Sequence, residues 1–157
     1  MTPSFKSLHK GITMIYFALI MMQILFALVV YYLIYSGQLV AELDKESAQT
    51  LKYVLYVLCP LGVVAGHMIY RQNIGAIDAT QPMQARFNKL QVAVLIRSAC
   101  LEVPSLLGAV AAMLTGDPYY LLFTAIMVAL FFVWRPTQAS VAEELQLSPS
   151  EREAMGN

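Results

Sequence analysis

Two charged residues, Arg97 and Glu102, lie inside one long apolar run that extends from about Leu90 to Leu114. In a helix that crosses a bilayer, an unpaired charge near the centre costs about 2.5–3.5 kcal/mol on insertion scales. Such side chains usually face the interior of a helical bundle, where they find polar partners. Five positions advance a helix by about 500°, which leaves the two side chains about 140° apart. At least one of the two side chains must therefore find its polar partner on another helix.

Other polar residues fall at similar depths in the neighbouring apolar runs. With a rise of about 1.5 Å per residue, Gln23 and Thr124 come near the level of Glu102, close to the middle of the membrane. The same reckoning places His67 within about one turn of Arg97, nearer to one surface. We therefore predict two polar layers, one with Glu102, Gln23 and Thr124, and one with Arg97 and His67.

Two interpretations of Glu102 are open at this point. In the first, its carboxyl carries a proton, as in a small transporter or a proton-conducting protein. In the second, Glu102 is a structural acid that hydrogen-bonds to Gln23 or Arg97 and fixes the packing of the helices. Pro60 and Pro104 each free a backbone carbonyl at similar depth, which fits an ion or proton site as well as a simple helix bend.

The chain offers few of the residue combinations that catalysis or cofactor binding requires. His67 is either a membrane-edge histidine or a ligand, and a bis-histidine haem would need His9, which lies outside the apolar runs. Cys59 and Cys100 have no CxxC spacing, so we interpret them as buried thiols rather than as a disulfide or metal site. The apolar runs contain one acid, one histidine and no aspartate, which is too few reactive side chains for the active site of an enzyme. We expect no enzymatic activity, no metal and no cofactor.

Four apolar segments are long enough to carry these residues across a bilayer, whose hydrocarbon core needs about 20 helical residues. The third and fourth are joined by Thr115-Gly116-Asp117-Pro118, which leaves room only for a tight turn. Gly116 suits the left-handed end of one helix, Asp117 the cap of the next and Pro118 its first position. The sequence predicts an all-α, antiparallel bundle of four transmembrane helices, at about 12–35, 51–70, 90–114 and 119–134.

Small residues indicate where these helices approach one another closely, because they let backbones meet in lipid. The second segment contains a GxxxG pair, and the third has a stripe of small residues around Glu102 at helical spacing. We therefore expect Glu102 to point at a packed interface rather than at lipid. The predicted packing residues are Gly62, Gly66, Ser98, Ser105 and Ala109.

Composition supports lipid as the solvent, since 59% of the 157 residues are hydrophobic and 13% are charged, against about 25% charged in soluble domains. The formal net charge of zero argues against nucleic acid as a partner. Residues 1–136 are predicted to form one membrane domain, and 137–157 a short cytoplasmic helical tail. Within that tail, Ser148-Pro149-Ser150-Glu151 is typical of a cap that opens a last short turn.

The basic residues are distributed unevenly between the two predicted sides of the membrane. Lys45 and Lys52 lie on one side, beside four acids. Because basic residues concentrate in cytoplasmic segments, the other side is predicted to be the cytoplasm, with both chain ends there. We expect a multi-pass protein of the inner (plasma) membrane. The cytoplasmic basic residues would be Lys6, Lys10, Arg71, Arg86, Lys89, Arg135 and Arg152.

The pattern resembles that of small four-helix membrane proteins of bacteria, most of which have no characterised activity. The resemblance lies in the segment from Gln23 to Phe26, the step from Arg97 to Glu102, Thr115-Gly116-Asp117, and Arg135-Pro136-Thr137 ahead of a helical tail. It implies no catalytic or binding residue. We expect a non-enzymatic subunit or scaffold that packs against itself or a larger membrane complex, with a transporter or proton-conducting protein as the alternative.

Overall fold

The computed structural model describes residues 5–39 and 41–147. Within these residues the chain is helical and has no β-strand. Three helices, α1 (Phe5–Tyr35), α2 (Lys45–Gly75) and α3 (Met83–Thr115), are long and apolar enough to cross a membrane. The shorter helices α4 (Leu121–Val133) and α5 (Gln138–Glu144) are bent by 70° at a short break and together make up to one more span. This is the architecture of a multi-pass membrane protein.

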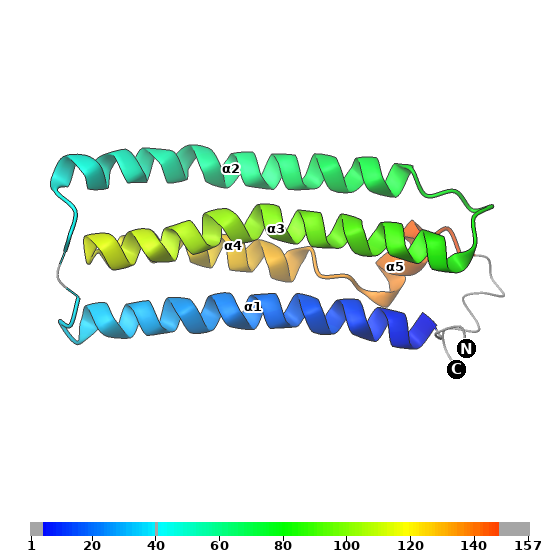
Figure 1. Cartoon of the computed structure of the whole chain (residues 1–157), viewed down its shortest axis with the longest axis horizontal. Helices are drawn as coiled ribbons and strands as arrows, with labels where there is room; N and C mark the ends of the chain where they lie inside the picture. Colours follow the sequence, from blue (N-terminus) through cyan, green and yellow to red (C-terminus); the bar gives the residue numbers. More distant parts are fainter. Residues whose placement is uncertain (1–4, 40, 148–157) are drawn as a thin grey trace.

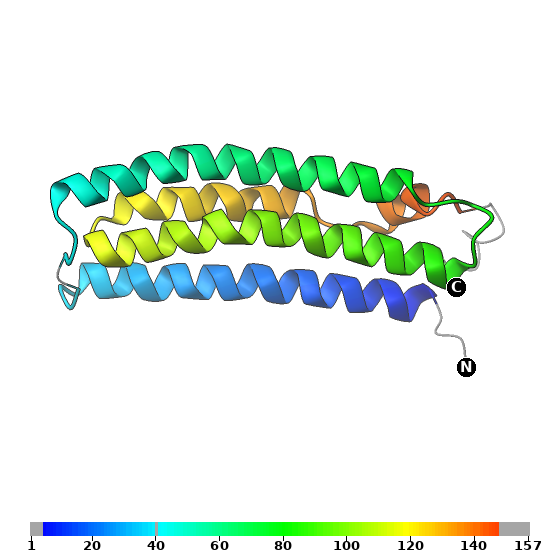
Figure 2. The same cartoon turned by 45° about the horizontal axis from the view of Figure 1, so that its top comes forward.

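Helices α1 to α4 lie side by side along the long axis of the molecule (Figures 1 and 2). Consecutive helices run in opposite directions, so α1 and α3 are parallel to each other. Helix α3 contacts α1, α2 and α4 and is the central helix. The α1–α2 and α3–α4 connections lie at one end, called here the turn end. The α2–α3 connection, the start of α1 and helix α5 lie at the opposite end, called the loop end.

The helices extend beyond the apolar segments from which they were predicted. Helix α1 begins at Phe5 rather than near 12, α2 covers Lys45–Gly75 rather than 51–70, and α3 begins at Met83 rather than near 90. The flanking turns contain Lys, Gln, Glu and Ala, which are strong helix formers although most are polar. Hydropathy located the apolar part of each helix and therefore missed these terminal turns.

The turn between α3 and α4 confirms the local prediction. Gly116 has φ 66° and ψ 11°, the left-handed conformation that ends α3. The Asp117 side chain accepts a hydrogen bond from the backbone N–H of Tyr119 at 2.9 Å. Pro118 opens a single 3-10 turn, Pro118–Tyr120, which precedes α4. Helices α3 and α4 therefore form a tight antiparallel hairpin.

Tyrosines tie this hairpin to α2 at the turn end. The Tyr120 hydroxyl donates to the carbonyl of Ala48 at 2.6 Å. The hydroxyls of Tyr56 and Tyr119 are hydrogen-bonded to each other at 2.8 Å. Both contacts join the beginning of α2 to the beginning of α4, so these two parallel helices start at a fixed relative height.

Helix α5 lies at the loop end, beside the end of α2 in Figure 2, and the residue that follows it is bonded to α3. Thr137 caps α5 in a reciprocal arrangement with Ser140, in which each side chain accepts from the other's backbone N–H. Arg86 Nη1 donates to the carbonyl of Leu145 at 2.8 Å, and Leu145 and Leu147 are buried. The segment predicted as a tail, 137–157, thus contains one helix, α5, within its described part, and the predicted cap at 148–151 lies outside the described residues.

Candidate functional site

One group of polar side chains in the interior surrounds the end of α4. The buried Tyr16 hydroxyl of α1 donates to the carbonyl of Phe131 at 2.7 Å. Arg97 Nη2 of α3 donates to the carbonyl of Trp134, just after α4 ends, at 2.8 Å. The last carbonyls of a helix lack intrahelical partners and carry partial negative charge, and no water serves them at membrane depth. Tyr16 and Arg97 thus cap α4 from two other helices.

Aromatic rings enclose the Arg97 guanidinium, which belongs to a side chain only 7% exposed. Its central carbon lies 3.7 Å from the centroid of the Tyr70 ring and 5.5 Å from that of Trp134. A cation above an aromatic face is attracted by the ring quadrupole, and more strongly when water is excluded. These rings therefore stabilise the arginine at a position where an isolated charge would be unfavourable.

The predicted residue His67 is exposed and joins this arrangement through the same tryptophan. Its ring stacks on Trp134 with centroids 5.7 Å apart and an interplanar angle of 29°. The structure thus brings both Arg97 and His67 into contact with Trp134. Glu144 of α5 completes the group, because its carboxyl interacts with the side chain of Tyr70 and with the charge of Arg97. We call these side chains the Arg97 cluster: Tyr16, His67, Tyr70, Arg97, Trp134 and Glu144.

Gln23 and Thr124 lie at one level, seven residues further toward the turn end. The hydrogen bond between Tyr16 and Phe131 fixes the antiparallel register of α1 and α4, and seven residues along each helix lead to Gln23 and Thr124. Thr124 Oγ1 donates to the carbonyl of Ser105 at 2.7 Å. Gln23 is 0% exposed, and neither of its amide heavy atoms has a hydrogen-bond partner; the same holds for Ser105 Oγ. Such atoms are the kind that a buried water or a polar ligand satisfies.

Glu102 is placed differently from the expectation that it points into the interior. It is partly exposed, and among the described residues neither Gln23 nor Arg97 is hydrogen-bonded to its carboxyl. It follows Leu101, which is fully buried, and one residue turns a side chain by about 100°. The stripe that was predicted to enclose the acid is real, but Glu102 lies at its border.

That border faces α1. Leu95 and Ser98 of α3, together with Ile15 and Leu19 of α1, line a small cavity between the two helices. Glu102 comes seven and four residues after these two α3 positions and therefore continues the same face toward the middle of the span. The acid lies on the lateral edge of the α1–α3 contact.

The predicted GxxxG pair packs α2 closely against α3 within the same chain. A methyl group added at Gly62 would lie 2.5 Å from the carbonyl oxygen of Cys100 and 3.3 Å from Cγ of Pro104. At Gly66 it would lie 2.9 Å from Cβ of Cys100. Pro104 leaves the Cys100 carbonyl without its helical hydrogen bond, and this free carbonyl faces the bare backbone of Gly62. The other predicted packing residues, Ser98, Ser105 and Ala109, are all buried on α3.

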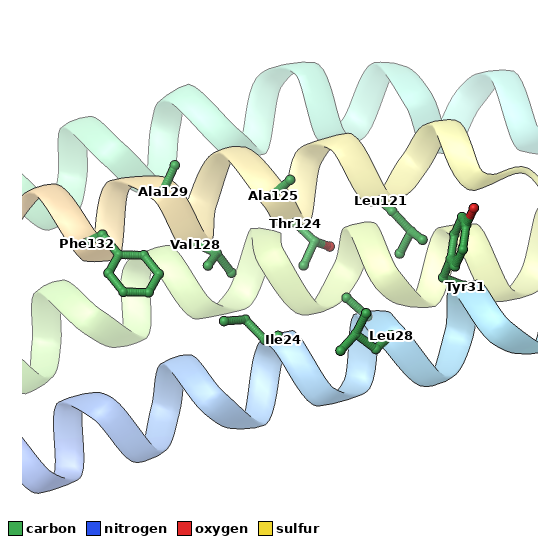
Figure 3. Close-up of a pocket in the computed structure, with 10 residues that line it drawn as sticks. Ile24, Leu28, Tyr31, Leu121, Thr124, Ala125, Val128, Ala129 and Phe132 are labelled. Carbon is green, nitrogen blue, oxygen red and sulfur yellow. The ribbon is translucent and has the colours of Figure 1, made fainter.

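An apolar groove of about 480 Å³ separates α1 from α4 on the outer surface. Figure 3 shows Ile24 and Leu28 of α1 on one side and Val128 of α4 on the other, with Tyr31 and Phe132 at opposite ends. On the α4 side, the small side chains of Ala125 and Ala129 leave the groove open. The groove opens laterally, where lipid or another helix would lie.

Sequence reasoning did not identify Tyr16, Tyr70 or Glu144 as members of the site. Tyrosines within apolar runs look like ordinary core or belt residues, and Glu144 belongs to a segment that looks like a solvated tail. A usable signal was the spacing of Ile12, Tyr16, Ile20 and Gln23, which lie on one buried face of α1.

Comparison with family models, curated proteins and solved structures finds no match to this chain. Among the described residues, no group of three or more histidine, cysteine, aspartate or glutamate side chains is arranged to hold a metal ion. The function must therefore be argued from the geometry.

Proposed function

We propose that the protein crosses the membrane four times, with α4 as the fourth crossing and the loop end in the cytoplasm. On α2, Lys52 and Arg71 are separated by 19 positions, about 29 Å, with no Asp, Glu, Lys or Arg between them. This matches the hydrocarbon thickness of a bilayer, about 30 Å. Lys10, Arg86, Lys89 and Arg135 support the orientation because all lie toward the loop end.

Within this topology, we propose that the protein is a non-enzymatic subunit of a membrane complex. The observation that carries the proposal is Glu102, a partly exposed acid on the lateral edge of α3. It lies 13 residues, about 20 Å, from Thr115 at the turn end of its helix. An acid left to lipid at that depth is unfavourable by about 2.5–3.5 kcal/mol. A neighbouring transmembrane helix that donates a hydrogen bond to Glu102 and covers the α1–α3 edge removes this penalty.

Several other polar and small residues of the interior support a structural role. Arg97 and Tyr16 serve the carbonyls at the end of α4, and the GxxxG face serves the α2–α3 contact. These groups are therefore occupied by the fold itself. Within the described part of the chain, Glu102 is a charge in the apolar part of α3 that makes no hydrogen bond or ion pair, and the proposed partner contact is centred on it.

Affinity purification from native membranes in mild detergent tests this proposal. Wild type should retain a stoichiometric partner or a homo-oligomer, Glu102→Gln should retain most of it, and Glu102→Leu should release it. Val103→Leu is the matched control, because Val103 is exposed at the same depth but points elsewhere. A wild-type chain recovered only as a monomer, or equal recovery with Glu102→Leu, would refute the proposal.

The second candidate is a small transporter or proton-conducting protein that uses Glu102. It is favoured by the polar level of Gln23, Ser105 and Thr124 at similar depth, where buried atoms without partners would attract water or an ion. Proton flux into proteoliposomes distinguishes the candidates. Flux that disappears in Glu102→Gln supports conduction, whereas absence of flux in wild type removes this candidate.

A further inference from the structure

Gln23 places an amide group inside the bundle without a protein partner. The side chain is 0% exposed, and among the described residues neither its oxygen nor its nitrogen is hydrogen-bonded. Ser105 of α3 is also 0% exposed, and its hydroxyl has no partner in the same part of the chain. Buried polar atoms are nearly always hydrogen-bonded, to protein or to ordered water, and lipid offers neither donor nor acceptor. These three atoms therefore indicate a site for a hydrogen-bonding ligand.

Contacts across three helices bring Gln23 and Ser105 to one place. Helix α1 packs against α3 and α4, so these two helices cover the buried side chain of Gln23. The bond between Tyr16 and Phe131 sets the register that brings Thr124 opposite Gln23. Thr124 Oγ1 in turn donates to the carbonyl of Ser105 at 2.7 Å. The amide and the serine hydroxyl thus belong to the same junction of α1, α3 and α4.

The contact between α1 and α3 leaves room for a small ligand beside this junction. A cavity of about 10 Å³ lies between the two helices, and Leu19 and Ser98 are among the residues that line it. Leu19 comes one turn before Gln23, and helical side chains lean toward the N-terminus of their helix, so Gln23 leans toward this cavity. A buried water needs about 10–15 Å³. The space suits a water molecule and is too small for an organic ligand.

The chemistry of the two side chains favours a neutral ligand over an ion. The amide supplies two N–H donors and one acceptor oxygen, and the hydroxyl both donates and accepts. A cation would use only the oxygens and an anion only the donors, whereas water uses both. We propose that a buried water bridges the Gln23 amide and the Ser105 hydroxyl and so links α1 to the α3–α4 hairpin. This site goes beyond the partner contact at Glu102 and does not depend on it.

Nuclear magnetic resonance of the full chain in detergent micelles tests for the water directly. With isotope-labelled glutamine, the side-chain amide of Gln23 is assigned by the loss of its signal in Gln23→Leu. Its protons should show a nuclear Overhauser effect to water. This effect should persist in Ser105→Ala, because the water keeps its bonds to the amide and a relay through the serine hydroxyl is no longer possible. A wild-type amide without the effect, or an effect that disappears in Ser105→Ala, would overturn the proposal.

A double-mutant cycle tests whether the two side chains share the water. Gln23→Leu removes the group that anchors it, so the effect of Ser105→Ala on the unfolding equilibrium should differ by at least about twofold between this background and wild type. Cys59→Ala is the matched control, since it truncates a buried side chain of α2, which α3 separates from α1 in Figure 1. Its effect should be the same in both backgrounds. Independent effects of Gln23→Leu and Ser105→Ala would refute the bridge.

Discussion

Replacement of Tyr16 by phenylalanine removes one hydroxyl and tests whether the end of α4 depends on a cap supplied by α1. The hydroxyl donates to the buried carbonyl of Phe131 at 2.7 Å. Without it, this carbonyl keeps its desolvation but loses its tertiary hydrogen bond, which costs about 1–3 kcal/mol in protein interiors. Interhelical hydrogen bonds measured in membranes average about 0.6 kcal/mol and reach about 1.7 kcal/mol. We therefore expect a loss of about 1–2 kcal/mol, which is roughly 5- to 30-fold in the unfolding equilibrium.

The assay is reversible unfolding in mixed detergent micelles, followed by the fluorescence of Trp134 and by helical circular dichroism. The matched control is Tyr32→Phe, on the same helix but exposed, for which we expect a change within about 0.5 kcal/mol, as at other surface positions. If Tyr16→Phe were as stable as the control, the hydroxyl would not cap α4. The interpretation of the Arg97 cluster as a helix-capping device would then be refuted.

Further predictions concern the same packing. Arg97→Met should make the segment after α4 more mobile and shift the fluorescence emission of Trp134 to the red. Arg97→Lys retains the charge and should shift the emission less. Identical emission spectra for the two variants and wild type would contradict the role of Arg97. Gly62→Ala should lower the stability of the folded protein by about 1–3 kcal/mol through overpacking against Cys100. Gly11→Ala is the control, because nothing lies within 4 Å of the added methyl group, and it should be neutral or stabilising. The two variants should therefore differ in thermal unfolding. Thr137→Ala should cost about 1 kcal/mol of α5 stability and speed hydrogen exchange there, and unchanged exchange would show that the capping box is not required.

The parts of the fold that depend on neighbouring residues in the sequence were predictable. The turn at Gly116 and Asp117 follows from the backbone freedom of glycine and the capping ability of aspartate, and both act locally. The centres of α1, α2 and α3 follow from the hydropathy of runs that lipid must accommodate. The terminal turns were missed because their residues favour helix without being apolar, so hydropathy alone cannot detect them.

The site itself was less predictable because it depends on which helices meet. The depth of Arg97 follows from the sequence, but its capping of the Trp134 carbonyl requires α4 to end beside α3, which only the tertiary arrangement shows. For Glu102, a stripe of small residues identifies a face only to within a wide angle. A residue one position after the buried Leu101 can therefore belong to the interior or to its border, and here it lies at the border.

In the proposed topology, with α4 as the fourth crossing, the brevity of α4 also affects the bilayer around it. Its 13 residues rise about 20 Å, and the preceding 3-10 turn adds about 6 Å, so the pair is shorter than a hydrocarbon core of about 30 Å. Lipids next to α4 must shorten or tilt to match it, while those next to α2 need not. The bilayer should therefore be thinner beside α4 than beside α2. Thin bilayers should accommodate the protein with less distortion than thick ones.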